Sequence, residues 1–137
     1  MTYRASAKAV LTLALIGLAD ATYLAVKHYV GGSVPCSITE GCDTVLQSQY
    51  AVYLGVPLAL WGVAYYLTIV LLTALFFQFN SSRVLGLIFG LVTGGILVSG
   101  VLIYVQGVVL AAWCAYCLVS AIITLLIFLT LIFSRPA

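Results

Sequence analysis

The fold of this 137-residue chain is decided by two apolar runs and the short polar turn between them, 57-PLALWGVAYYLTIVLLTALFFQFNSSRVLGLIFGLVTGGILVSGVLIYV-105. The first run starts at Pro57, a residue suited to the first turn of a helix, and ends near Phe79. The second run follows the turn 80-NSSR-83 and continues over residues 84–105. About 20 apolar residues in a helix cross the core of a bilayer, so each run is predicted to be a transmembrane helix.

Two further apolar runs, at residues 9–29 and 114–133, are also long enough to span a bilayer. The chain is 65% hydrophobic and 6% charged, whereas soluble domains carry about 25% charged residues. In lipid every backbone N–H and C=O must be satisfied internally, which favours helices. The sequence therefore predicts an all-α integral membrane protein. It forms a single domain, residues 1–137, in which four transmembrane helices make a bundle.

Lysine and arginine residues are distributed unevenly between the two ends of the predicted helices. One end carries Arg4, Lys8, Arg83 and Arg135, and the other end carries Lys27. Cytoplasmic loops carry the excess of basic residues, so both termini are predicted to be cytoplasmic. The long loop over residues 30–56 then lies on the extracytoplasmic face of a multi-pass plasma membrane protein.

The third predicted helix carries a regular spacing of glycines. Gly86, Gly90 and Gly94 recur every four residues, which places them on one face. Small residues in this pattern let helix backbones approach closely. We therefore predict that this face packs tightly against the rest of the bundle.

Four cysteines provide the reactive chemistry of the chain. Cys36 and Cys42 lie in the long loop, and Cys114 and Cys117 form a Cys-x-x-Cys at the start of the last predicted helix. All four fall on the predicted extracytoplasmic face, where disulfides form and persist. Three interpretations are open: local structural disulfides, a zinc site with four cysteine ligands, and thiol–disulfide exchange.

The position of the Cys-x-x-Cys favours thiol–disulfide exchange. Cys114 is predicted to begin a helix, where the macrodipole and free N–H groups stabilise a thiolate. A second pair on a loop can move between an outside partner and this inner pair, and two pairs make a relay. A closed four-cysteine site usually lies among polar turns rather than at a lipid boundary, so no metal is expected.

A relay needs a terminal electron acceptor. The single histidine excludes a haem held between two histidines, and the chain has no dinucleotide-binding fingerprint. The small net charge of +2 makes nucleic acid an unsuitable partner. A lipid-soluble quinone fits what remains. We predict that it enters from the bilayer and binds near Cys117, against Leu58, Trp61 and Tyr65, although ordinary packing also explains these three residues.

The quinone is expected to lie under a lid. Residues 43–48 are predicted to form a short helix, because Asp43 can accept hydrogen bonds from its first N–H groups. The helix is partly apolar and would lie flat at the membrane interface. The alternative is an irregular loop closed by a bridge between Cys36 and Cys42.

Asp20 is an acidic residue within the first predicted span. A carboxyl group inside a membrane is costly, and this makes Asp20 a candidate functional residue. It could supply protons for quinone reduction. Alternatively, it fastens the first helix to a neighbour or orders the lid by a hydrogen bond.

Three segments together resemble the vitamin K epoxide reductase family. They are 20-DATYL-24, 36-CSITEGCDTVLQSQYAVYLGVPLALWGVAYY-66 and 113-WCAYC-117. The resemblance covers nearly the whole chain and is greatest to microbial members that drive disulfide formation.

The resemblance implies a role for each cysteine. Cys36 and Cys42 would take electrons from a partner thiol, Cys42 would exchange with Cys114, and Cys117 would pass the electrons to quinone. Microbial members use a thioredoxin-fold partner and ubiquinone or menaquinone. Some carry that partner fused at the C-terminus; this chain stops at Ala137, so a separate extracytoplasmic protein is expected.

The sequence departs from the animal members of the family at two positions. Ala51 and Ala121 stand where those members have an Asn and a Tyr that hold the quinone carbonyls. The quinone pocket is therefore expected to include Ala51 and Ala121 together with Leu46 and Ser48, with hydrogen bonds from groups such as Ser48 or Asp20. Two alternatives remain: a vitamin K or epoxide reductase that mainly makes hydroquinone, and a non-enzymatic scaffold of four spans with structural disulfides.

Overall fold

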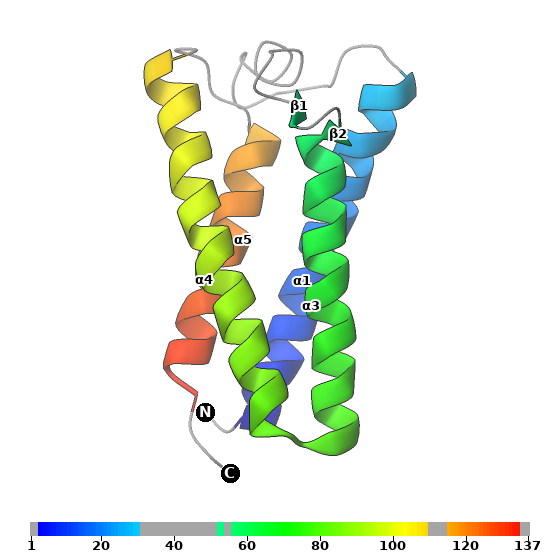
Figure 1. Ribbon diagram of the computed structural model, residues 1–137, viewed down its shortest axis with the longest axis vertical. Coiled ribbons are helices and arrows are strands. Elements are labelled where there is room, and N and C mark those ends of the chain that lie inside the picture. Colours follow the sequence, from blue (N-terminus) through cyan, green and yellow to red (C-terminus); the bar gives the residue numbers. More distant parts are fainter. Residues whose placement is uncertain (1–2, 31–51, 54–55, 110–114, 135–137) are drawn as a thin grey trace.

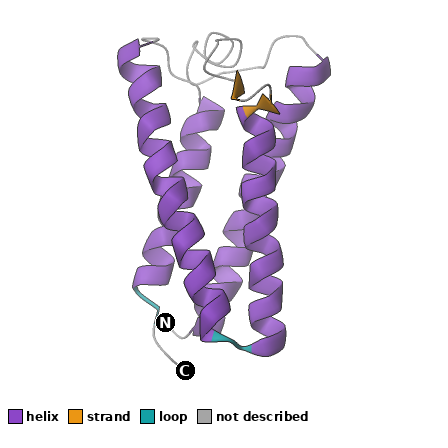
Figure 2. Ribbon diagram, viewed as in Figure 1, coloured by secondary structure: helices purple, strands orange, loops and turns teal. Residues whose placement is uncertain are grey.

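The computed structural model describes residues 3–30, 52–53, 56–109 and 115–134, and these form a bundle of four long helices (Figure 1). The helices are α1 (Tyr3–Val30), α3 (Leu58–Phe79), α4 (Ser82–Tyr104) and α5 (Ala115–Ile132). A π-helical turn, η2 (Val105–Val109), continues α4. Two short strands, β1 (Val52–Tyr53) and β2 (Val56–Pro57), pair antiparallel just before α3 (Figure 2).

The helices alternate in direction and form a closed ring. α1 packs against α3 and α5, and α4 completes the ring by packing against the same two helices. The start of α1, the end of α5 and the turn between α3 and α4 lie at one end (Figure 1). The end of α1, the strand pair, η2 and the start of α5 lie at the other end, which we call the loop end.

The predicted four-helix bundle is confirmed, with changes at the helix ends. Three helices are long and apolar enough to cross a membrane by length and composition, and α5 is shorter. α1 begins at Tyr3 rather than residue 9, because Ser6 and Ala7 are buried against the bundle. The Arg4 guanidinium also lies 5.7 Å from the centre of the Phe77 ring on α3, within the range of a cation–π contact.

The turn between α3 and α4 is shorter than predicted. It consists of Asn80 and Ser81, since α4 already begins at Ser82. Asn80 has a φ of 50°, a left-handed conformation that asparagine tolerates better than most residues. Its N–H donates to the Phe76 carbonyl oxygen at 2.7 Å and closes the last turn of α3.

At the other end of α3, Pro57 belongs to β2 and not, as was predicted, to the helix. The predicted lid over residues 43–48 lies outside the described residues.

The core lies between the four helices, and lipid is the natural solvent for the rest of the apolar surface. The core is built from Val10, Ala14 and Ala21 of α1, Tyr66 and Ile69 of α3, Ile88 and Val92 of α4, and Ile123, Ile127 and Leu131 of α5. Many other large apolar side chains on these helices are exposed, which a soluble protein could not sustain at this density.

The prediction that Gly86, Gly90 and Gly94 pack tightly is wrong. All three are exposed, and a Cβ atom built at each would meet no atom of the described chain within 4 Å. Ile88 and Val92 provide the buried face of α4. Each glycine is two residues along the chain from Ile88 or Val92. Two residues correspond to a rotation of about 200° around a helix with 3.6 residues per turn, so the glycines lie on the opposite side of α4.

Two other glycines allow the close approaches that the bundle needs. A Cβ at Gly17 of α1 would overlap the ring of Tyr66, and a Cβ at Gly95 of α4 would overlap the hydroxyl end of Tyr65. Both tyrosines belong to α3, so these glycines let α1 and α4 accommodate its largest interior side chains. Gly17 and Gly95 therefore determine how closely three of the helices pack.

Gly17→Ala is expected to destabilise the protein by about 1–3 kcal/mol, the usual cost of overpacking a core. The buried Tyr66 ring has no room to move away, since its hydroxyl is hydrogen bonded to α5. Gly90→Ala is the matched control and should be neutral or slightly stabilising, because alanine is the better helix former and its methyl group meets open space. Thermal unfolding in detergent, followed by circular dichroism, measures both. Equal effects of the two changes would contradict this packing.

Candidate functional site

Cys117 is the cysteine that the structure describes, and it lies near the loop end. It is the third residue of α5 and is half-buried. Cys36, Cys42 and Cys114, and the predicted pocket residues Leu46, Ser48 and Ala51, lie outside the described residues. The described residues that flank these segments, at the end of α1, β1, the end of η2 and the start of α5, all lie at the loop end (Figure 1).

Cys117 belongs to a polar face of α5. Ser120, Ala121 and Thr124 follow it at helical spacings of three, four and seven residues, which places all four on one side of the helix. One residue before Cys117, the ring of Tyr116 lies 5.6 Å from the ring of Tyr23 on α1. The ring contact brings the start of α5 beside α1.

Four hydroxyl groups meet just inside Cys117, and we call them the hydroxyl cluster: Tyr65, Tyr66, Ser120 and Thr124. The Tyr66 hydroxyl donates to the Ser120 carbonyl oxygen at 3.0 Å and lies 2.8 Å from Ser120 Oγ and 3.3 Å from Thr124 Oγ1. The Tyr65 hydroxyl donates to Thr124 Oγ1 at 3.5 Å. Tyr66 is only 1% exposed, so these bonds satisfy a polar group in the middle of the bundle.

Asp20 of α1 adjoins the hydroxyl cluster. It follows Gly17, which lies against the Tyr66 ring, by three residues, or about one helical turn. One carboxyl oxygen, Oδ2, is buried and has no hydrogen-bond partner among the described residues. A buried acceptor left without a partner costs about 1–3 kcal/mol, so this atom calls for an explanation.

The remaining predicted pocket residues differ in how far they are buried in the bundle. Tyr65 and Ala121 are half-buried, and Tyr65 belongs to the hydroxyl cluster itself. Trp61 is 43% exposed, so much of its surface lies open at the outside of α3. Leu58 is the first residue of α3. Cys117, Tyr65, Ala121 and Asp20 are thus the predicted residues that lie on or beside the interior of the bundle.

Three members of the hydroxyl cluster were missed by the sequence analysis. Ser120 and Thr124 follow Cys117 on one helical face, and polar residues in transmembrane helices commonly form hydrogen bonds between helices. That spacing was a usable signal. Tyr66 could not be separated from its neighbour Tyr65 without knowing which side of α3 faces α5.

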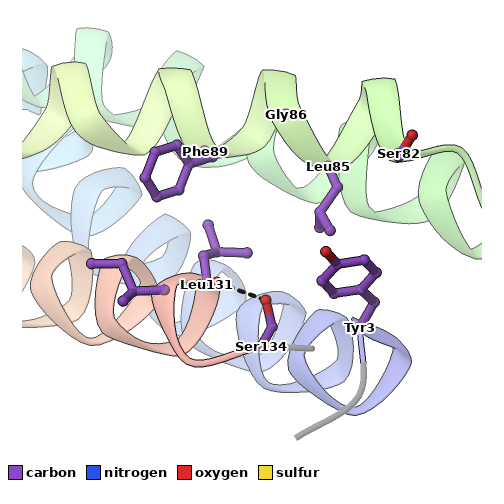
Figure 3. Close-up of a pocket in the computed structure, with 8 residues that line it drawn as sticks. Tyr3, Ser82, Leu85, Gly86, Phe89, Leu131 and Ser134 are labelled. Carbon is purple, nitrogen blue, oxygen red and sulfur yellow. Dashed lines mark hydrogen bonds between the residues drawn. The ribbon is translucent and has the colours of Figure 1, made fainter. Parts of the chain in front are cut away.

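A groove of about 530 Å³ lies at the opposite end of the bundle, away from Cys117 (Figure 3). It runs between α4 and α5 and is bordered by the start of α1. Its walls are Tyr3, Ser82, Leu85, Gly86, Phe89, Leu131, Ile132 and Ser134. Ser134 Oγ donates to the Leu131 carbonyl oxygen at 2.6 Å, so this polar group is already satisfied. The groove is separate from the quinone site that the sequence predicts.

Comparison with known proteins agrees with the helical bundle and the cysteine pattern. The sequence matches the vitamin K epoxide reductase family over residues 8–132. A curated relative, the "Thiol-disulfide oxidoreductase LTO1" of Arabidopsis thaliana, is 34% identical over 117 residues, which cover 80% of this chain and 31% of that protein. The chain thus spans less than a third of the length of this relative. Because the family match takes in all four cysteines and reaches into each of the four helices, the chain belongs to the vitamin K epoxide reductase family.

Proposed function

We propose that this protein is a membrane thiol–disulfide oxidoreductase that supports disulfide bond formation. It oxidises the dithiol of a separate thioredoxin-fold protein on the extracytoplasmic side and passes the electrons to a membrane quinone of the ubiquinone or menaquinone type. The observation that carries this proposal is the Cys-x-x-Cys at the start of α5, at the same end as the attachment points of the segment with Cys36 and Cys42. The family match and the name of the plant relative support the same chemistry.

The four cysteines act in sequence. The partner's dithiol attacks the disulfide between Cys36 and Cys42 and leaves as a disulfide, so two electrons move to the loop pair. Cys42 then attacks the disulfide between Cys114 and Cys117, which regenerates the loop disulfide and reduces the inner pair. Each exchange proceeds by attack of a thiolate through a mixed disulfide.

The interior beside Cys117 suits a quinone ring. When bound, a quinone supplies an acceptor for two electrons and two protons. Ala121 follows Cys117 by four residues on the same face of α5, and its small side chain would not obstruct a flat ring. Asp20 adds a carboxyl oxygen without a partner among the described residues, and Tyr65 adds an aromatic wall. Cys117, Ala121, Tyr65 and Asp20 are the described residues that would surround it.

The orientation of the chain is part of the proposal. Both termini lie in the cytoplasm, which follows from the basic residues at that end of the helices. The loop end then faces the oxidising side of the membrane. A thioredoxin-fold partner in that compartment can reach Cys36 and Cys42, whereas cytosolic reductants cannot.

Redox cycling of the cysteines distinguishes this enzyme from a scaffold with structural disulfides. In vesicles depleted of quinone, a reduced thioredoxin-fold protein is expected to leave all four cysteines reduced. Addition of quinone should then reoxidise them. Gel shifts with a maleimide polymer report the number of free thiols at each stage. Cysteines that stay oxidised and unreactive under both conditions would instead indicate a scaffold.

A further inference from the structure

The cysteine relay leaves the protons of the reaction without an assigned route. Quinone reduction consumes two protons inside the membrane, where few side chains can hold one. Among the described residues, Asp20 is the one carboxyl group in the bundle, and its Oδ2 atom is buried without a partner.

The helix contacts place Asp20 close to the level of Cys117. α1 and α5 run in opposite directions, and the Tyr23–Tyr116 ring contact sets these two residues at one level. Moving three residues down α1 to Asp20 corresponds to moving about three residues down α5 to Val119. Cys117 is two residues above that level, or roughly 3 Å along the bundle axis at 1.5 Å per residue.

The two tyrosine hydroxyls of the hydroxyl cluster already donate their protons within the bundle. Tyr66 donates to the Ser120 carbonyl oxygen, and Tyr65 donates to Thr124 Oγ1. A quinone carbonyl can only accept hydrogen bonds, so its partner must have a proton to give. A protonated carboxyl at Asp20 meets that requirement.

We propose that Asp20 is the catalytic proton donor of this protein, and that its carboxyl hydrogen bonds a carbonyl oxygen of the quinone that reacts with the Cys114–Cys117 dithiol. This inference rests on the proposed function and adds a residue to it. The hydroxyl cluster joins α3 to α5 beneath this position, and Gly17 of α1 lies against the Tyr66 ring of the cluster.

The proton and electron balance closes within the site. As the S–S bond between Cys114 and Cys117 forms, the dithiol loses two electrons and two protons. Asp20 gives its proton to one carbonyl oxygen of the quinone and recovers a proton released by the dithiol. The second thiol proton goes to the other oxygen, so two electrons and two protons leave the protein and arrive on the quinol.

Three substitutions of Asp20 separate proton donation from binding and from structure. Asp20→Asn keeps a hydrogen-bond donor, so binding of a short-chain ubiquinone to the oxidised protein should be nearly unchanged by titration calorimetry. The same variant cannot give up a proton, and reduction of that ubiquinone should slow by about 10²-fold or more. Asp20→Glu should recover much of the rate. Asp20→Leu should weaken binding but unfold at or above the wild-type temperature, because it removes a buried oxygen without a partner.

Ser6→Ala is the matched control, since Ser6 is the other buried group of α1 without a partner among the described residues and lies far from Cys117. It should change neither binding nor rate. If Asp20→Asn reduces ubiquinone at the wild-type rate, or if Asp20→Leu lowers the unfolding temperature markedly, Asp20 fastens α1 and this inference is wrong. If the wild-type protein itself reduces neither ubiquinone nor menaquinone, the proposed function fails and the inference fails with it.

Discussion

Cys117→Ala is expected to reduce quinone turnover to the background rate of vesicles without protein. Cys117 lies on the interior face of α5 beside Ala121, and without its sulfur the inner pair cannot form a disulfide and release two electrons together. The first exchange should survive, because it needs only the disulfide between Cys36 and Cys42. One equivalent of a reduced thioredoxin-fold partner should therefore be oxidised, and the reaction should then stop. Stopped-flow measurement of partner oxidation and of ubiquinone absorbance reads the two steps separately.

Val119→Ala is the control for this change, since Val119 is an exposed residue of the same helix one turn from the loop end. It should retain turnover and a normal first exchange. Retained steady turnover in Cys117→Ala would refute the relay, because some other group would have to deliver the electrons. If Cys117→Ala also fails to oxidise the first equivalent of the partner, Cys117 takes part in the first exchange and not only in the transfer to quinone.

The helices of this protein could be predicted from its sequence because lipid imposes a simple rule. A segment that is long and apolar must be helical in a bilayer, and four such segments are visible in the sequence. The same rule fails at the helix ends. Residues 3–8 include Arg4 and Lys8, so hydropathy alone excludes them, yet α1 begins at Tyr3 because Ser6 and Ala7 pack into the bundle.

Which side of each helix faces inward could not be predicted from local spacing. The glycine pattern of α4 is real, but it lies opposite the buried pair Ile88 and Val92. A small-residue pattern shows that a face is able to pack closely, and it does not show that a neighbour is present. Gly17 and Gly95, which the pattern did not include, make the close contacts because two tyrosines of α3 extend toward them.

The candidate site was predictable where chemistry is concentrated in one residue type. Cysteines and a membrane carboxyl group are conspicuous, and the Cys-x-x-Cys and Asp20 were recognised on that ground. The hydroxyl cluster was not predictable in this way, because Tyr66 and Ser120 are 54 residues apart and neither is unusual in an apolar helix. Their contact depends on the parallel register of α3 and α5, which only the folded bundle reveals.

Cys42→Ala is expected to stop electron transfer from a thioredoxin-fold protein while sparing quinone reduction by a small dithiol. In the proposed relay a folded partner exchanges only with the loop pair, which carries its electrons inward to Cys114 and Cys117. A small dithiol such as dithiothreitol can reach the inner pair itself. Ubiquinone absorbance, measured with each reductant in turn, gives the two rates.

The same variant can also reveal the partner. Cys36 has lost the thiol that would displace a bound protein. After treatment with the thiol oxidant diamide, a mixed disulfide between Cys36 and a partner with a single reactive cysteine should therefore accumulate. Non-reducing electrophoresis followed by mass spectrometry identifies that partner. Cys36→Ala serves as the comparison. It should stop electron transfer from the protein partner to the same extent, but it should form no such adduct. If Cys42→Ala instead supports both reductants at wild-type rates, Cys36 and Cys42 only brace the loop, and the inner pair must meet its protein substrate directly.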